Sequence, residues 1–186
     1  NFMCVAAPGA GKSRYSAELA RACFLGRHID FVLFFAPSVT VATGIQTTFS
    51  EVLNDPFDGK MGAKGKVVTY QAIQHTFNEL MYLIKSFRVL IISDEIHHCS
   101  SGSGDFGNQW GMLIEALTQL GSPLTLTLSG TPWRSNKTKI ALQTYSGEPE
   151  ELHIDFIYGL GDAVLDKVCR SPNLILLDND LITVTE

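Results

Sequence analysis

Residues 6–13 of this chain read AAPGAGKS, a glycine-rich turn between an apolar strand and a helix. The apolar run Phe2–Ala6 precedes the turn, and a helix is expected from about Lys12 to Phe24. Small residues let backbone N–H groups curl round a phosphate, and the following helix directs its positive N-terminal end at the same group. Because a phosphate-binding loop requires a strand, such a turn and a helix in this order, the sequence predicts a nucleotide site here.

Each residue type in this loop has a chemical role. Gly9 and Gly11 would adopt backbone torsions that are closed to other residues. Lys12 would reach the β- and γ-phosphates of ATP, and the Ser13 hydroxyl would hold Mg²⁺. The residues expected to bind the nucleotide are Pro8, Gly9, Ala10, Gly11, Lys12, Ser13 and Arg14.

The rest of the chain alternates strands with helices. Further strands are expected at 30–36, 66–70, 88–92, 124–128, 152–158 and 174–177, and further helices at 41–53, 71–85, 110–120 and 162–169. Repeated strand–helix units with short connections predict an α/β fold, with a mostly parallel sheet flanked by helices on both faces. Ligands of such sheets bind at the carboxyl ends of the strands, and the polar motifs of this chain fall at those ends.

Two adjacent acids, Asp94 and Glu95, follow the apolar strand at 88–92. Neighbouring carboxylates repel each other, so the pair indicates that a cation lies beside it. Asp94 is expected to hold Mg²⁺ through water, together with the hydroxyl of Ser13. Glu95 is expected to orient or deprotonate the water that attacks the γ-phosphate. The predicted catalytic residues are therefore Lys12, Asp94 and Glu95.

Composition excludes several other classes of protein. A net charge of −5 argues against binding nucleic acid through a broad basic face. Four scattered cysteines form no CxxC pair, which excludes a zinc ribbon, and Cys4 and Cys169 are expected in the core. The apolar run 31–36 is far shorter than a bilayer span, and no signal pattern begins the chain. No membrane partner is therefore expected, and the expected location is cytoplasmic.

Taken together, the motifs resemble those of superfamily 2 helicases of the DEAD/DEAH-box (DExH) type, and in particular the motor subunits of type III restriction enzymes. AAPGAGKS is similar to their first motif, and DEIH at 94–97 is similar to their DExH box. LSGTPWR at 128–134 looks like their third motif in its Ser-Gly-Thr-Pro form. FAPS at 35–38 resembles motif Ia, and VVTYQ at 67–71 resembles a Thr-Tyr-Gln segment of these motors.

The resemblance implies the N-terminal RecA-like P-loop NTPase domain of a motor that uses ATP and Mg²⁺ to act on nucleic acid. The residues it implies as links between the nucleotide site and the nucleic acid are His97, Ser129, Gly130 and Thr131. The residues it implies as nucleic-acid contacts are Pro37, Ser38 and Thr69. Hydroxyl and backbone N–H contacts to phosphates need no net positive charge. An ordinary role in turns at strand ends stays open for Ser38 and Thr69.

Members of the resembled family have two RecA-like domains, and the second supplies arginines that stabilise the transition state. Residues 1–186 are expected to form one RecA-like domain only, as a nearly inactive fragment whose partner is the missing second domain of the same chain. Trp133 would stack on a base or pack at an edge, and Arg134 would form a surface or interdomain salt bridge.

DNA is favoured over RNA as the polymer only by the Ser-Gly-Thr-Pro form of the third motif. An RNA helicase of the DExH type is therefore one alternative. A non-catalytic, nucleotide-dependent binding module is another alternative. The presence of Lys12, Asp94 and Glu95 argues against it, because a domain that has lost ATPase activity does not require all three.

Overall fold

The computed structural model describes residues 1–101, 106–134 and 138–170. Its main sheet has six strands in the order β3-β2-β4-β5-β1-β8, and every pairing in it is parallel. The strands are β1 (Phe2–Ala6), β2 (Phe31–Ala36), β3 (Gly65–Thr69), β4 (Val89–Ser93), β5 (Leu124–Ser129) and β8 (Phe156–Tyr158). The predicted α/β fold with a parallel sheet is therefore confirmed.

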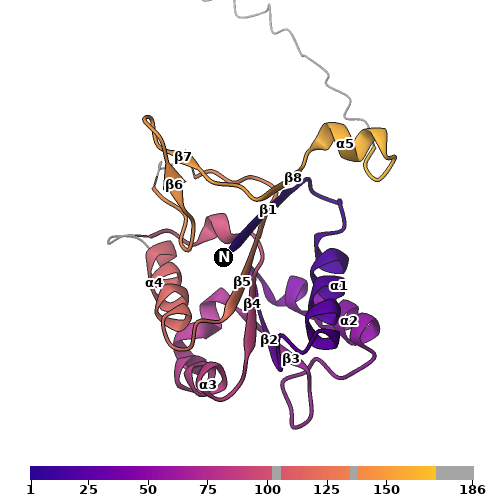
Figure 1. Cartoon of the computed structure of the whole chain (residues 1–186), viewed down its shortest axis with the longest axis vertical. Coiled ribbons are helices and arrows are strands. Elements are labelled where there is room, and N and C mark those ends of the chain that lie inside the picture. Colours follow the sequence, from indigo (N-terminus) through magenta and orange to yellow (C-terminus); the bar gives the residue numbers. More distant parts are fainter. Residues whose placement is uncertain (102–105, 135–137, 171–186) are drawn as a thin grey trace, which may run out of the picture.

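Helices cover both faces of this sheet, as predicted (Figure 1). One face carries α1 (Lys12–Leu25) and α2 (Val39–Leu53), and the other carries α3 (Ile73–Ser86) and α4 (Phe106–Thr118). Two short 3₁₀ helices, η1 (Tyr70–Ala72) and η2 (Ile96–His98), follow β3 and β4. Each helix in the part of the chain that the structure describes is too short or too polar to cross a membrane.

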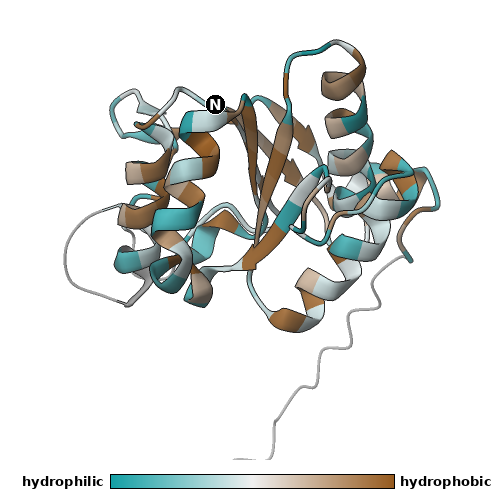
Figure 2. Cartoon of the chain, turned by 90° about the horizontal axis from the view of Figure 1, so that it is seen from below, coloured by the Kyte–Doolittle hydropathy of each residue, from teal (hydrophilic) through white to brown (hydrophobic). Residues whose placement is uncertain are grey.

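The sheet divides the hydrophobic core into two clusters, because alternate residues of a strand point to opposite faces. In β2, Leu33 and Phe35 pack with the residues of α3 and α4, whereas Val32 and Phe34 pack with those of α1 and α2. All six residues of β2 are buried, which explains why this strand is a continuous apolar run. Figure 2 shows the hydrophobic strands passing between the two layers of helices.

The prediction of one strand at 152–158 is wrong. The segment instead forms β7 (Glu151–Leu152), which pairs with β6 (Tyr145–Ser146) in an antiparallel hairpin, and β8, which pairs with β1. The chain changes partners at Asp155, whose carboxylate accepts a hydrogen bond from the Met3 N–H at 2.7 Å. This contact attaches the segment to the edge of the main sheet. The second half of the segment, β8, therefore forms the edge strand beside β1.

The last predicted helix is also shifted, since α5 spans Leu160–Leu165 rather than 162–169. It begins earlier because the Asp162 carboxylate accepts a hydrogen bond from the Gly159 N–H at 3.0 Å and so caps its start. It ends earlier because Lys167 adopts a left-handed conformation with φ of 60°. The predicted strand at 174–177 lies outside the described residues.

Candidate nucleotide-binding site

The predicted site residues all follow strands of the main sheet. The phosphate loop follows β1, Pro37 and Ser38 follow β2, Thr69 ends β3, and Asp94 and Glu95 follow β4. Ser129 is the last residue of β5, and Gly130 and Thr131 follow it. Parallel strands bring their carboxyl ends to one edge of the sheet, so strand pairing gathers these residues there. A cavity of about 600 Å³ lies at the opposite edge, among residues that precede β2, β4 and β5. Chemistry rather than cavity size therefore locates the site.

The phosphate loop has the backbone conformation that its glycines predict. Gly9 and Gly11 have φ values of 79° and 81°, in the left-handed region that favours glycine. Helix α1 begins at Lys12, directly after Gly11. The first N–H groups of a helix have no partner within it, so they are available to an anion in the loop.

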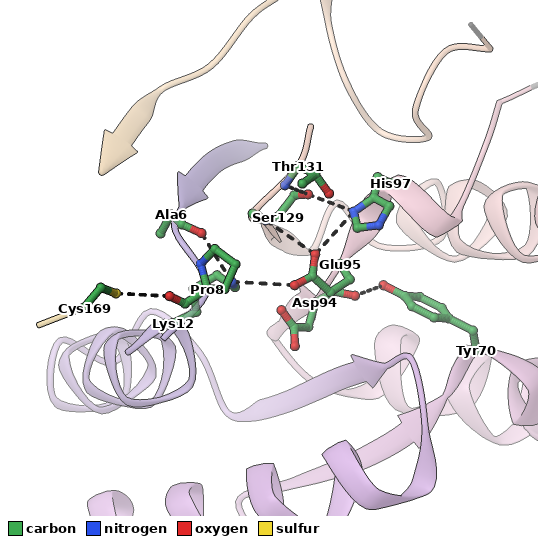
Figure 3. Close-up of polar contacts among 11 residues, drawn as sticks. Ala6, Pro8, Lys12, Tyr70, Asp94, Glu95, His97, Ser129, Thr131 and Cys169 are labelled. Atoms are coloured by element: carbon green, nitrogen blue, oxygen red, sulfur yellow. Dashed lines mark hydrogen bonds and ion pairs between the residues drawn. The ribbon is translucent and has the colours of Figure 1, made fainter. Parts of the chain in front are cut away.

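Lys12 and Glu95 meet between β1 and β4 (Figure 3). The Lys12 Nζ lies 3.6 Å from the Glu95 Oε1 and donates a hydrogen bond to the Ala6 carbonyl at 3.3 Å. The other carboxylate oxygen of Glu95 lies 3.3 Å from the His97 Nδ1 and accepts a hydrogen bond from the Gly130 N–H at 3.4 Å. The hydrogen bond with His97, supported by the charge of Lys12, lowers the pKa of Glu95 to about 2. Glu95 is therefore a carboxylate at neutral pH.

The residues predicted to link the nucleotide site to the nucleic acid form one polar network. The His97 Nδ1 lies 2.9 Å from the Ser129 Oγ, which accepts a hydrogen bond from the Thr131 N–H at 3.1 Å. Together with Gly130, these residues join the carboxylate of Glu95 to the end of β5. A movement of the backbone after β5 would therefore change the position of Glu95, because Ser129 contacts His97 and His97 contacts the Glu95 carboxylate.

Asp94 fits a magnesium ligand. It is 8% exposed, and its Oδ1 has no hydrogen-bond partner among the residues that the structure describes. Burial, with the adjacent charge of Glu95, raises the pKa of Asp94 to about 6. A buried carboxylate oxygen without a donor, beside a phosphate loop, is suited to a cation. Mg²⁺ binds through one or two carboxylates together with substrate phosphates, so the carboxylate of Asp94 and the hydroxyl of Ser13 fit it.

Arg14 lies in the first turn of α1 and is exposed. Its guanidinium lies 3.3 Å from Glu18, one turn later in α1, and its side chain is 63% exposed. The structure thus gives Arg14 a partner on the helix surface, and contact with a nucleotide stays a prediction.

The predicted nucleic-acid contacts lie along the same edge. Ser38 is exposed and caps α2, since its Oγ accepts a hydrogen bond from the Val41 N–H at 3.3 Å. Thr69, at the end of β3, is half-buried and lines a groove of about 330 Å³ with residues of α2. The capping role of Ser38 is established by this geometry, whereas nucleic-acid contact through Pro37, Ser38 and Thr69 stays a prediction.

One further expectation, for Cys169, is corrected, and those for Arg134 and Trp133 stay predictions. Arg134 donates hydrogen bonds to the His97 carbonyl and, at 2.9 Å, to the Thr138 hydroxyl, and its salt bridge on the surface or between domains stays a prediction. Cys169 is half-buried rather than in the core, and its thiol donates to the Pro8 carbonyl at 3.2 Å. Trp133 is 67% exposed, so both stacking on a base and packing at an exposed edge stay predictions.

Sequence reasoning missed one residue that touches the predicted catalytic pair. The Tyr70 hydroxyl donates a hydrogen bond to the Asp94 carbonyl at 2.6 Å, across the sheet from β3 to β4 (Figure 3). The only signal in the sequence was its position in VVTYQ, directly after an apolar strand. That motif does not disclose which strand lies beside it.

Comparison with known families gives one match over most of the chain. Residues 1–134 match the family described as "Type III restriction enzyme, res subunit". The match confirms the resemblance to superfamily 2 motors of the restriction-enzyme type. It covers every predicted site residue, from the phosphate loop to the third motif.

The chain is also similar to curated proteins of two mycobacteria. The chain is 24% identical over 188 residues to uncharacterized protein Rv2917 of Mycobacterium tuberculosis. It is 25% identical over 183 residues to uncharacterized protein ML1624 of Mycobacterium leprae. Each alignment covers 91% of this chain but only 29% of the relative, so the chain spans less than a third of these proteins.

Solved structures show the same fold. A nuclease-deletion mutant of the Type ISP restriction-modification enzyme LlaGI, in complex with a DNA substrate mimic, is 17% identical with a TM-score of 0.62, over 90% of this chain and 18% of that one. The UvsW helicase of bacteriophage T4 is 18% identical with a TM-score of 0.52, over 73% of this chain and 48% of that one. These similarities confirm the predicted RecA-like α/β fold.

Proposed function

Because the chain belongs to the family described as the type III restriction enzyme res subunit, we propose that it is the ATP-hydrolysing motor domain of a superfamily 2 DNA helicase or translocase. The observation that carries the proposal is the meeting of Lys12 and Glu95 at 3.6 Å, beside the unpartnered carboxylate oxygen of Asp94. A phosphate ligand, a base and a cation ligand thus converge where a γ-phosphate and its attacking water would lie.

Hydrolysis would use the side chains of this edge in distinct roles. The ammonium of Lys12 and the N-terminus of α1 would stabilise the charge that develops on the transferred phosphoryl group. Glu95 would accept a proton from water as its oxygen bonds to the γ-phosphorus, and the bond to the β–γ bridging oxygen would break, releasing ADP and phosphate. Mg²⁺, held by Ser13 and through water by Asp94, would neutralise part of the phosphate charge.

The ion pair between Lys12 and Glu95 gives this mechanism a simple form of control. A bound phosphate competes with Glu95 for the ammonium of Lys12. Since the charge of Lys12 lowers the pKa of Glu95, a shift of Lys12 towards phosphate raises that pKa and makes Glu95 a stronger base. Nucleotide binding would therefore activate the carboxylate that it requires.

DNA is the proposed polymer, and the related LlaGI structure with its DNA substrate mimic supports this choice by analogy. The network of His97, Ser129 and Thr131 would couple hydrolysis to movement along the strand. A second RecA-like domain of the same protein would complete the cleft and supply arginines to the transition state. An RNA helicase is the nearest alternative, and a nucleotide-dependent binding module without catalysis is the other.

The test is ATP hydrolysis by the full-length protein, alone and with single-stranded DNA, duplex DNA or RNA. We expect DNA but not RNA to stimulate ATP hydrolysis. Stimulation by RNA alone would instead support an RNA helicase. Glu95→Gln should retain bound ATP while losing turnover. ATP binding without hydrolysis in the unaltered protein, under all four conditions, would leave the binding module as the function.

A further inference from the structure

The side chain of Tyr70 connects the end of β3 to the turn that carries the predicted catalytic acids. Its hydroxyl donates to the Asp94 carbonyl at 2.6 Å, and the residue is 1% exposed (Figure 3). The Asp94 N–H donates in turn to the Phe35 carbonyl at 3.0 Å. These two hydrogen bonds hold the peptide groups on both sides of Asp94.

The peptide between Asp94 and Glu95 needs such support. Glu95 has φ of 49° and ψ of 48°, a left-handed conformation that is unfavourable for a residue with a side chain. Strained backbone of this kind persists only where surrounding contacts hold it, and it occurs often at functional sites. The orientation of this peptide sets the direction in which the Glu95 side chain leaves the backbone, towards Lys12 and His97.

The Tyr70 ring is packed between two aromatic rings, so the position of its hydroxyl is restricted. The ring stacks on Phe35 with centroids 6.4 Å apart and an interplanar angle of 23°. On another side it stacks on Trp110 of α4, at 5.9 Å and 15°. Close packing of this kind leaves the ring few alternative positions.

We propose that Tyr70 is a positioning residue for ATP hydrolysis, whose hydroxyl fixes the Asp94–Glu95 peptide and so aims the Glu95 carboxylate at the attacking water. The inference rests on the proposed function. Tyr70 also follows Thr69 directly, so this predicted nucleic-acid contact is connected to Glu95 through the Tyr70 side chain and its hydrogen bond to the Asp94 carbonyl.

A merely structural role for the hydroxyl makes a different prediction. In that case it would only satisfy a buried carbonyl, and its removal would lower stability without a selective effect on the chemical step. If the hydroxyl positions Glu95, its removal should lower kcat and leave the KM for ATP unchanged, because Tyr70 does not contact the phosphate loop.

The experiment compares Tyr70→Phe with the unaltered full-length protein, with DNA present. The substitution removes one oxygen and keeps the ring between Phe35 and Trp110. Tyr82→Phe is the matched control, since the Tyr82 side chain in α3 is 69% exposed. Far-UV circular dichroism and a thermal unfolding curve show whether each variant is folded at the assay temperature.

We expect kcat to fall about 10- to 100-fold in Tyr70→Phe, with the KM for ATP changed less than about twofold. In single-turnover assays, adding Tyr70→Phe to Glu95→Gln should lower the remaining rate no further, because both changes act through one carboxylate. Tyr82→Phe should match the unaltered protein.

An unchanged kcat in folded Tyr70→Phe would overturn the inference. So would an equal further loss when Tyr70→Phe is added to Glu95→Gln, because the hydroxyl would then act independently of the base. An unaltered protein without ATPase activity would instead overturn the proposed function, and the inference with it.

Discussion

The ammonium of Lys12 lies 3.6 Å from the Glu95 carboxylate and joins the loop after β1 to the turn after β4. The two side chains are only 12% and 28% exposed, so salt screens their attraction less than it screens a surface pair. Phosphate and carboxylate compete for the same cation. This competition makes Lys12 the point at which nucleotide binding would change the chemistry of the base.

Replacing Lys12 with alanine should lower kcat/KM for ATP by about 10²–10³-fold, because a charged donor to the transferred phosphoryl group is lost. The measurement is steady-state ATP hydrolysis by the full-length protein with DNA. Lys60→Ala is the control, since the Lys60 side chain is 83% exposed in the loop before β3. Equal activity of the two variants would exclude Lys12 from the reaction.

Asp94→Asn should raise the Mg²⁺ concentration that gives half-maximal ATPase activity by about 10- to 100-fold, because a neutral amide binds this hard cation poorly. The matched control is Asp58→Asn, in the exposed loop between α2 and β3. Chelation of Mg²⁺ with EDTA should abolish activity, and added Mg²⁺ should restore it. A Mg²⁺ dependence identical to that of the unaltered protein would contradict a metal role for Asp94.

Acidification should weaken the contribution of the pair formed by Asp30 and Arg88 to stability. Hydrogen bonds from Arg88 lower the pKa of Asp30 from 3.8 to about 2. A carboxyl whose pKa is lower in the folded state stabilises the fold above its unfolded pKa and loses that effect as the pH falls. Urea unfolding should therefore show Asp30→Asn less stable than the unaltered protein at pH 6, with the difference shrinking between about pH 4 and pH 2. A difference that stays constant down to pH 2 would exclude this linkage.

Phe49→Ala should destabilise the fold by about 3–5 kcal/mol, because it leaves a cavity in the cluster under α1 and α2. The Phe49 ring is fully buried and lies 5.5 Å from the ring of Phe34 and 4.5 Å from that of Phe57, between centroids. Met61→Ala, on a fully exposed residue, should change the free energy of unfolding by less than about 0.5 kcal/mol. Urea unfolding of both variants checks this, and similar values for the two would contradict the core assignment.

Much of the predicted site depended on local chemistry, which sequence alone can express. The torsions of Gly9 and Gly11, the start of α1 at Lys12 and the acids after β4 all lie within short contiguous segments. The six apolar residues of β2 likewise indicated a strand buried on both faces. These features follow from residue type and spacing, so the sequence predicts them without any tertiary contact.

Other features depended on which strands lie side by side, and the sequence carries no local signal for that. The segment 152–158 reads as one strand, but pairing with both β6 and β1 divides it into two. The hydrogen bond from Tyr70 to Asp94 and the contacts of Arg134 and Cys169 join segments far apart in the chain. By itself, then, the sequence determined a phosphate loop, an acidic pair and an alternating α/β pattern. Tertiary structure alone decided which side chain supports the acidic pair, because the Tyr70 hydroxyl meets the Asp94 carbonyl only once strand order brings the segments after β3 and β4 together.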